Sequence, residues 1–459
     1  MFCVLFLTVT VTCVSVSFGG DPDRDLIDGE YLFVWSKVAR ARGLTEEGDF
    51  FRRMRERFGD CALPKLELNV GEHRAYLLKN ITAAQAQEMQ QDVDPGFRFM
   101  EQNRRVRAFE SETTETATSA PTTSSEFCLE QDSMADDLWG LTRIDQRTEV
   151  GRTGSFSWRN VDDDGAGVDV YVIDSGVTIT HNDFEGRAKH GFTAGTISGE
   201  GSKDFNGHGT HVAGTVGGAT FGVAKNANII AVKVLNEEGV GSIADIIDGI
   251  EFALADFREK GSRKAVINMS LGSSGFSLLL QLATMEAINA GIHVVVAAGN
   301  DFDDACDYTP ASVADAITVA ASNDRDDVTS FSNFGACVDI FAPGEDIWSA
   351  SSTGGNARAS MSGTSMAAPH VAGALARLLS RYDNPLTPRE ATKLMMAEAT
   401  RGVIDLSRIR DSSQRSNTID DLLYIDCYGS SGSRASVTSC TVVTLVAALA
   451  SYVLFTFVQ

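Results

Sequence analysis

An alternation of short apolar runs with longer helical stretches across residues 132–427 is the feature that most constrains the fold. Four runs rich in Val, Ile and Ala are typical of buried parallel strands: residues 168–173, 229–234, 265–269 and 292–297. Helical periodicity lies between them, most clearly in residues 243–257 and 278–290. Buried strands separated by helices predict an α/β fold with a doubly wound, mostly parallel sheet.

Polar residues follow two of these runs, at the edge where such a fold places its chemistry. Asp174 comes directly after the first run, and Asn300 follows the fourth within Ala298-Gly299-Asn300. Glycines 165 and 167 resemble a dinucleotide-binding loop, but they precede the strand instead of following it. Their order excludes that interpretation.

A hydroxyl stands at the start of a predicted helix in the stretch Ser362-Gly363-Thr364-Ser365-Met366-Ala367-Ala368-Pro369-His370. The apolar run 371–379 predicts the helix, with Pro369 in its first turn, where a missing N–H costs nothing. Ser365 would face unpaired amides and the positive end of the helix dipole. Taken alone, the stretch favours a simple helix cap, because Ser is a preferred N-cap residue.

Two histidines, His208 and His211, lie three residues apart in Asn206-Gly207-His208-Gly209-Thr210-His211. A zinc site is the alternative for this spacing. However, the stretch lacks the Glu of the zinc-peptidase motif, and its glycines favour close backbone packing. We therefore interpret His208 as a general base.

Together, Asp174, His208, Ser365 and Asn300 supply the roles that acyl transfer needs. Ser365 is the predicted nucleophile, and His208 would take its proton and return it to the leaving amine. Asp174 would hold the imidazole tautomer and stabilise the imidazolium. The Asn300 amide, with the Ser365 backbone N–H, would stabilise the oxyanion.

These motifs resemble those of the subtilisin-like serine proteases, the subtilases. The resemblance rests on the order Asp, His, Ser and on Val172-Ile173-Asp174-Ser175-Gly176, Gly207-His208-Gly209-Thr210-His211 and Gly363-Thr364-Ser365-Met366-Ala367. It covers residues 139–424 and is strongest to the proteinase K group, which includes aqualysin-like enzymes. It implies a secreted serine endopeptidase of broad specificity.

The resemblance also implies where substrate binds. One edge strand would pair with the substrate backbone and a second segment would flank it, so that recognition works by strand addition. Small residues would line the S1 pocket and leave room for a bulky apolar P1 side chain. The three segments are Ser270, Leu271 and Gly272; Gly239, Val240 and Gly241; and Ala297, Ala298 and Gly299.

Structural calcium is the cofactor that the resemblance implies. In the proteinase K group an Asp matching Asp339 and carbonyls matching Ala314 and Ala316 hold one ion. Aqualysin-like members form a disulfide at the positions of Cys306 and Cys337. Pairing of Cys128 with Cys427 stays open.

The remaining segments predict a precursor. Residues 1–18 are typical of a secretory signal peptide, with a retained anchor as the alternative. Residues 30–110, with two predicted strands and two helices, resemble the subtilase propeptide, which chaperones folding and inhibits the enzyme. Residues 111–131 form a Ser/Thr-rich linker suited to activation cleavage, and the peptidase domain spans 132–427. Residues 428–459 combine a polar spacer with an apolar tail, which favours a GPI signal over a membrane anchor.

Composition limits the partners. The formal net charge is −23 and the sequence pI is about 4.7, so nucleic acid and anionic membranes should be repelled. We expect a secreted monomer, tethered at the cell surface if the tail is used, that acts on proteins and peptides with its propeptide as intramolecular inhibitor. The main rival keeps the four residues but stays propeptide-bound as a surface binding protein. An esterase is a third interpretation.

Overall fold

The computed structural model describes residues 23–37, 47–91, 96–110, 116–117, 129–130, 137–148, 157–158, 164–261 and 264–425. The predicted signal peptide, most of the predicted linker, Cys128, Cys427 and the C-terminal tail lie outside the described residues. Among the described helices, none has both the length and the apolar character needed to span a membrane.

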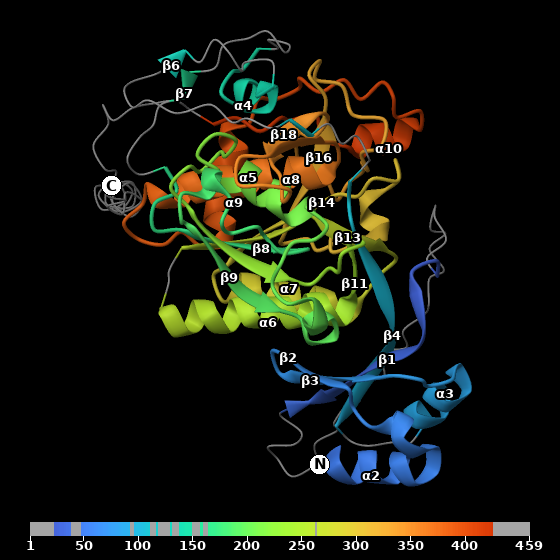
Figure 1. Ribbon diagram of the computed structural model, residues 1–459. Coiled ribbons are helices and arrows are strands. Elements are labelled where there is room, and N and C mark those ends of the chain that lie inside the picture. The colour runs from blue at the N-terminus through green and yellow to red at the C-terminus, as the bar shows by residue number, and fades with distance from the viewer. Residues whose placement is uncertain are drawn as a thin grey trace, which may run out of the picture.

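A seven-stranded parallel sheet organises the larger unit (Figure 1). Its order is β17-β16-β14-β12-β8-β10-β9. The strands are β8 (Asp169–Asp174), β9 (Ala188–Thr193), β10 (Asn228–Lys233), β12 (Ala265–Met269), β14 (His293–Ala297), β16 (Ile317–Ser322) and β17 (Ile340–Pro343). The four predicted strands correspond to β8, β10, β12 and β14, which confirms the predicted fold class. Because β10 and β12 flank β8, the strand order reverses there and opens a crevice at its carboxyl end.

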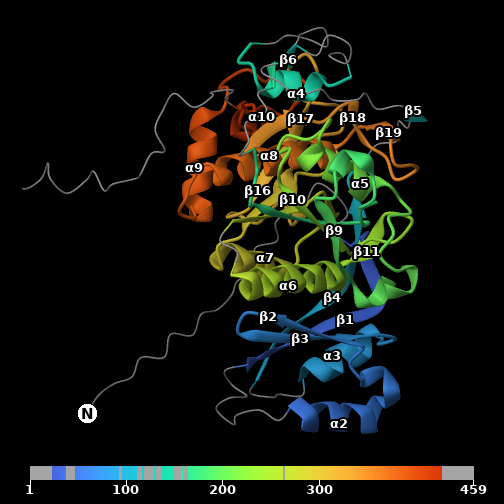
Figure 2. The same ribbon diagram turned by 60° about the vertical axis from the view of Figure 1, so that its left-hand side comes forward.

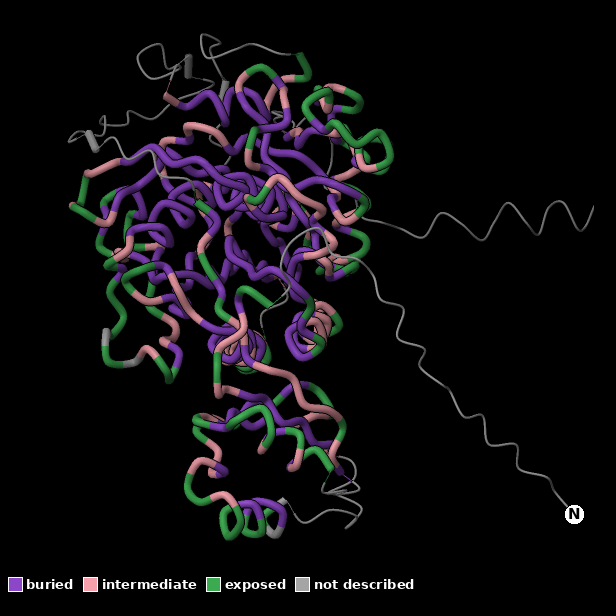
Figure 3. Tube along the Cα trace, turned by 90° about the vertical axis from the view of Figure 1, so that its right-hand side faces the viewer, coloured by how far each residue is buried: buried purple, intermediate pink, exposed green. Residues whose placement is uncertain are grey.

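Helices cover both faces of this sheet (Figures 1 and 2). Val170 and Val172 of β8 pack with α5 (His208–Gly217) and α8 (Thr364–Ser380). The alternate residues Tyr171 and Ile173 pack with α6 (Ile243–Lys260) and α7 (Leu278–Asn289). Both faces of the strand are therefore buried, which explains its continuous apolar sequence. In Figure 3 buried residues fill the interior of the larger unit.

The remaining elements of the larger unit are short. Three of them border the active-site region: β11 (Val240–Ser242), β13 (Leu271–Ser274) and β15 (Tyr308–Thr309). The others are β5 (Thr116–Ala117), β6 (Leu129–Glu130), α4 (Trp139–Ile144), β7 (Ser157–Trp158), β18 (Ile347–Ala350), β19 (Arg358–Met361), α9 (Pro388–Glu398) and α10 (Ser412–Asn417). A disulfide joins Cys306 to Cys337, the pair that the resemblance implied, with 5.2 Å between the Cα atoms.

The N-terminal unit has four strands where the sequence predicted two. They are β1 (Leu26–Ser36), β2 (Leu66–Val70), β3 (His73–Leu78) and β4 (Phe97–Ala108), in the antiparallel order β4-β1-β3-β2. The two predicted helices correspond to α2 (Glu47–Phe58) and α3 (Ala83–Gln91). The prediction missed β2 and β4, and β4 proves to be the strand that enters the active-site region.

The N-terminal sheet buries both of its faces. Phe33 and Trp35 of β1 pack against the unit's own helix α2, where the Trp35 and Phe50 ring centroids lie 4.9 Å apart. The alternate residues Leu32 and Val34 belong to the apolar cluster that α6 and α7 share with the main sheet. Figures 1 and 2 show the unit lying below these two helices. Packing against the larger unit thus buries the face of the N-terminal sheet that the unit's own helices do not cover.

Candidate active site

Asp174 and His208 form a buried hydrogen-bonded pair at the carboxyl edge of the main sheet. Asp174 ends β8 and His208 begins α5, and both side chains are fully buried. His208 Nδ1 lies 2.7 Å from Asp174 Oδ1, which also accepts a hydrogen bond from the Ser175 amide. His208 Nε2 has no hydrogen-bond partner among the described residues. The ring is therefore oriented by one nitrogen and has the other available for proton transfer.

Opposing effects set the basicity of His208. Burial lowers its pKa, but the negative charges of Asp174 and Glu110 and the Asp174 hydrogen bond raise it, and the result is a pKa of about 9. His211 behaves differently, because burial lowers its pKa to about 3 and its Nε2 lies 2.8 Å from the Ile347 carbonyl oxygen. The two imidazoles thus have separate partners, unlike the ligands of a shared metal ion.

Ser365 is the second residue of α8 and is fully buried. Its hydroxyl donates a hydrogen bond to the Ser270 carbonyl oxygen at 2.8 Å and accepts one from the Phe109 amide at 3.0 Å. The hydroxyl must rotate away from Ser270 to donate to His208 Nε2. The N-terminus of a long helix lies directly behind this serine.

The prediction for Pro369 was wrong. Helix α8 begins at Thr364, so Pro369 lies inside the helix and not in its first turn. A proline removes the amide that would bond the carbonyl four residues earlier, here that of Ser365. The Ser270 hydroxyl donates to this carbonyl instead, at 2.9 Å. Ser270 and Ser365 therefore exchange two hydrogen bonds, each hydroxyl donating to the other's carbonyl.

The Asn300 amide is held so that its nitrogen faces the cleft. Its Oδ1 accepts hydrogen bonds from the Thr364 amide at 2.9 Å and the Thr364 hydroxyl at 2.8 Å. Its Nδ2 is buried and has no hydrogen-bond partner among the described residues. A Cβ added at Gly363 would lie 2.1 Å from the Phe109 carbonyl oxygen and 3.0 Å from Asn300 Nδ2. The Phe109 carbonyl therefore points into the space beside an unused donor, as in an oxyanion hole.

Strand β4 occupies the cleft between the two segments that the sequence predicted to bind substrate. It pairs antiparallel with β11, where Val240 and Gly241 face Arg107 and Val106, and with β13, where Leu271 faces Ala108. Figure 1 shows β4 running from the N-terminal unit to these strands. The Ala108 amide donates to the Gly239 carbonyl at 3.1 Å, and the Phe109 amide lies 3.4 Å from the Ser270 carbonyl.

The side chain of Phe109 fills an apolar pocket. It is 8% exposed and belongs to the cluster that contains the fully buried Ala297 and Ala298. A Cβ at Gly272 would lie 2.5 Å from Phe109 Cζ, so the ring needs a glycine at this position. Gly299 has φ of +109°, a conformation that L side chains rarely adopt. The Phe109 ring thus lies against Gly272 and belongs to the same buried cluster as Ala297 and Ala298, two of the predicted S1 residues.

Asp339, which the resemblance implied as a calcium ligand, is a largely buried carboxylate next to the main sheet. Burial raises its pKa to about 6, and one carboxylate oxygen accepts a hydrogen bond from the Thr318 amide at 2.8 Å. Ala316 directly precedes β16, and Ala314 is exposed nearby. A desolvated carboxylate is a ligand type that suits a hard divalent cation. No cluster of three His, Cys, Asp or Glu side chains occurs in the described part, so carbonyls would supply the other ligands.

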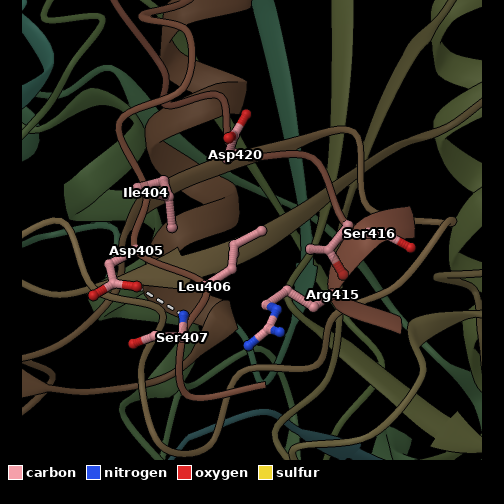
Figure 4. A pocket seen from close by; sticks show the side chains of 8 residues that line it. Ile404, Asp405, Leu406, Ser407, Arg415, Ser416 and Asp420 are labelled. Atoms are coloured by element: carbon pink, nitrogen blue, oxygen red, sulfur yellow. Dashed lines mark hydrogen bonds between the residues drawn. The ribbon is translucent and has the colours of Figure 1, made fainter. Parts of the chain in front are cut away.

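A second hollow lies apart from these residues, between residues 404–407 and helix α10 (Figure 4). Its lining is mostly polar, and the Asp405 carboxylate accepts a hydrogen bond from the Ser407 amide at 2.7 Å. The lining residues are Ile404, Asp405, Leu406, Ser407, Arg415, Ser416, Thr418 and Asp420. Since none of them belongs to the constellation around Ser365, we do not connect this hollow with the chemistry.

Sequence reasoning missed Thr364 and Phe109 as contributors to the site, and it gave Ser270 only a substrate-binding role. Thr364 fixes the Asn300 amide, Ser270 exchanges hydrogen bonds with Ser365, and Phe109 places its carbonyl beside Asn300. The first is adjacent to Ser365 in a motif already recognised, so its hydroxyl was a usable signal. The Ser270–Ser365 and Phe109–Ser365 contacts join residues 95 and 256 positions apart, so the local sequence gives no sign of them.

Comparison with known proteins identifies the class. The model of the subtilase family matches residues 165–421. An extracellular serine proteinase of Thermus sp. (strain Rt41A) is 44% identical over 311 residues, which are 68% of each chain. The subtilase-type proteinase psp3 of Schizosaccharomyces pombe is 48% identical over 272 residues, 58% of this chain and 59% of that protein. The crystal structure of a cold-adapted subtilisin-like serine proteinase matches with a TM-score of 0.55 and 42% identity, covering 63% of this chain and 98% of that one.

This chain belongs to the subtilase family, and it is a serine endopeptidase by class. The match spans about two thirds of the Thermus enzyme but a smaller part of the yeast relatives, 44% in the case of cerevisin from Saccharomyces cerevisiae. Subtilases commonly bind structural calcium.

Proposed function

We propose that this protein is a secreted serine endopeptidase made as a zymogen, and that it processes itself at the Phe109–Glu110 bond. The observation that carries the proposal is the position of β4, which lies in the substrate cleft with the Phe109 carbonyl beside Asn300 and its amide on Ser365. A polypeptide in this position is aligned as a substrate, with residues 105–109 on the unprimed side.

The chemistry follows from the positions of the four residues. Ser365 Oγ attacks the Phe109 carbonyl carbon while His208 Nε2 takes the hydroxyl proton. The oxyanion is stabilised by Asn300 Nδ2 and the Ser365 amide, and Asp174 stabilises the imidazolium. His208 then gives its proton to the Glu110 nitrogen as the C–N bond breaks. Water, deprotonated by His208, hydrolyses the acyl-enzyme and restores the Ser365 hydroxyl.

Substrate preference follows from the same cleft. The backbone of β4 pairs on both sides, so affinity for extended peptides comes from main-chain hydrogen bonds that any sequence can make. The pocket around Phe109 selects a large apolar side chain at P1. We therefore propose broad specificity with an apolar P1 preference, and we place the enzyme in the proteinase K group.

Cleavage after Phe109 leaves β4 in the cleft, and so the product remains an inhibitor. Its sheet packs on α6 and α7 through buried residues that the cut does not touch. Release requires a second event, for which the linker 111–131 is the proposed site of cleavage. A protein that never completes this release would be a surface binding protein, the rival function.

Secretion is supported by the name of the Thermus relative, which is an extracellular proteinase. Residues 1–18 would direct it and residues 428–459 would tether the enzyme at the cell surface. The proposed substrates are proteins and peptides, and the enzyme is proposed to act as a monomer.

The deciding experiment compares the wild-type precursor, expressed without residues 428–459, with its Ser365→Ala variant. N-terminal sequencing of the products and hydrolysis of a peptide anilide with Phe at P1 are measured. We expect wild type to yield a fragment beginning at Glu110 and then to turn over, while the variant stays intact. A wild-type chain that stays intact contradicts self-processing. A chain that cuts once and never turns over supports the binding protein instead.

A further inference from the structure

The residues that precede β1 contact the catalytic unit with their side chains, while their backbone pairs with β4. We name Asp23, Arg24 and Asp25 the N-terminal strap. The Asp25 carbonyl accepts a hydrogen bond from the Arg105 amide at 2.7 Å, and Leu26 pairs with Arg104. This backbone pairing places the strap beside the part of β4 that lies between β11 and β13.

Asp25 binds the rim of the cleft. Its side chain is 3% exposed, and its Oδ2 accepts hydrogen bonds from the Ser274 amide at 3.1 Å, the Ser274 hydroxyl at 2.8 Å and the Ser273 hydroxyl at 3.4 Å. Its Oδ1 forms an ion pair with Arg107 of β4 at 3.1 Å. A carboxylate this deeply buried needs such partners, because burying an uncompensated charge is costly. Ser273 and Ser274, both in β13, thus form the catalytic unit's half of an anion site.

Arg24 reaches further, to the residue that follows Asn300 in the chain. Its Nη2 and Nη1 donate to the two carboxylate oxygens of Asp301 at 2.8 and 3.3 Å, a two-pronged contact that raises the pKa of Arg24. Asp301 is fixed before Arg24 arrives, since its amide donates to Asn333 Oδ1 at 3.0 Å and Tyr308 donates to its carboxylate. Arg107, Asp25, Arg24 and Asp301 therefore form a row of alternating charges from β4 to the wall of the cleft.

We infer that Ser273, Ser274 and Asp301 form a docking site on the catalytic unit that recognises an Arg–Asp pair, and that the strap of this chain is its occupant. The inference rests on the proposed function, because it assigns the strap a role after self-processing. Cleavage of the Phe109–Glu110 bond frees the carboxyl end of β4 but leaves the strap contacts intact. The strap is thus a second anchor, which slows release of the inhibitor from a cleft that has already cut it.

Charge and geometry both support this occupant. The site presents hydroxyl and amide donors at one end and a fixed carboxylate at the other, so a ligand needs an anion and a cation on neighbouring residues. Arg24 and Asp25 provide them in the required order. The strap is not in the position of a substrate, because its backbone pairs with β4 and only its side chains reach the catalytic unit.

The experiment uses the full-length precursor after it has processed itself, purified as the complex of the two fragments. The complex is diluted into a small peptide anilide, and the lag before steady turnover measures the rate of inhibitor release. Each lag is compared with the final rate of the same sample, so that differences in intrinsic activity do not enter. The variants are Arg24→Ala, Asp301→Asn and Ser274→Ala, and Arg52→Ala is the matched control, because Arg52 pairs with Glu56 within α2.

We expect Arg24→Ala and Asp301→Asn each to shorten the lag about threefold to tenfold, as loss of a partly buried charge pair accelerates dissociation. The double variant should release no faster than the faster single variant, because the two residues act through one contact. Ser274→Ala should also shorten the lag, and Arg52→Ala should leave it unchanged.

Lags equal to wild type, or effects of Arg24→Ala and Asp301→Asn that simply multiply, would overturn the docking site. If the wild-type complex does not hydrolyse the anilide during the assay, the variants should still become active. Absence of hydrolysis in the variants as well would contradict the inference. Failure of the proposed function looks different, because then no fragment beginning at Glu110 forms in wild type.

Discussion

Among the carboxylates that raise the pKa of His208, Asp174 and Glu110 differ in permanence. Asp174 belongs to the catalytic unit and always accompanies the imidazole. Glu110 follows the proposed cleavage site, and its charge acts on His208 while the precursor is intact. In the intact precursor, His208 therefore has a higher pKa than it would have without Glu110. The pH dependence of self-processing should reflect this charge.

We expect Glu110→Gln to extend self-processing to lower pH. His208 must be neutral to take the Ser365 proton, so cleavage fails as the pH falls below its pKa. Removing the Glu110 charge lowers that pKa, and the pH of half-maximal cleavage should fall with it. The measurement is the cleavage rate across a pH series, with Glu110→Asp as the charge-preserving control. An acid limb that coincides with that of wild type would exclude this role for Glu110.

Asn300 can be tested apart from substrate binding. Its Nδ2 faces the Phe109 carbonyl but makes no hydrogen bond in the described structure, so it is available for charge that develops during the reaction. We expect Asn300→Ala to lower kcat for a peptide anilide about 10²–10³-fold, the cost of one oxyanion donor in subtilisin, with little change in KM. The melting temperature of each variant controls for folding. A loss below about threefold would place the oxyanion elsewhere.

At the scale of elements, sequence pattern predicted the strands that are buried on both faces. Strands β8, β10, β12 and β14 contain almost only apolar residues because helices cover each side. Strand β4 escaped prediction because its pairing with β11 and β13 uses backbone hydrogen bonds, which leave no apolar pattern in the sequence. Its sequence, FRFMEQNRRVRA, carries four arginines and one glutamate and shows no apolar period.

The start of α8 shows a different limit of prediction from sequence. The apolar run 371–379 predicted a helix with Pro369 in its first turn, but α8 begins at Thr364. Its first two turns, TSMAAPH, are buried and have no apolar periodicity of their own. The hydroxyl of Ser270, which lies between β12 and β13 and 95 residues away, satisfies the carbonyl that the proline leaves unpaired. A tertiary hydrogen bond therefore decides where this helix can continue, and local sequence does not contain it.

Strand β13 offers a test of the P1 pocket. In Gly272→Ala the new methyl group would overlap the Phe109 ring, so cleavage after Phe should slow at least about tenfold, the scale of steric overpacking. Phe109→Ala in the same precursor should restore processing, because a small side chain leaves room for the methyl group. The ratio of rates on anilides with Phe and Ala at P1 measures the effect. A ratio that does not change would show that P1 lies elsewhere.

Considered as a whole molecule, the two units share one apolar cluster and one antiparallel sheet. Leu32 and Val34 of β1 pack in the same cluster as Ile246 and Ile250 of α6. Strand β4 continues the N-terminal sheet into β13 and β15. Removing the N-terminal unit would expose the outer side of α6 and α7 to water. The same contacts that align Phe109 for cleavage therefore also support the folded catalytic unit, which is consistent with a chaperone role for residues 30–110.

Release of the N-terminal unit removes that support, so the mature enzyme should depend more on other sources of stability. Calcium at Asp339 is the proposed one. Burial raises the pKa of this carboxylate to about 6, and a bound divalent cation would offset the cost of keeping it ionised. A ligand that binds only the folded state stabilises it by about 2.7 kcal/mol at one hundred times its Kd.

We therefore expect a calcium chelator to lower the melting temperature of the mature enzyme by about 5 °C, since 1 kcal/mol shifts Tm by about 2–4 °C in a domain of 150–250 residues. The Asp339→Asn variant should melt at the lower temperature with or without chelator, which separates this site from any other calcium. The melting temperature of the precursor should fall less in chelator than that of the mature enzyme, because the N-terminal unit still covers α6 and α7. Differential scanning calorimetry of both forms in calcium and in chelator provides the measurement. Equal melting temperatures in the two buffers would remove calcium from the account, and a shift that persists in Asp339→Asn would move the ion to another site.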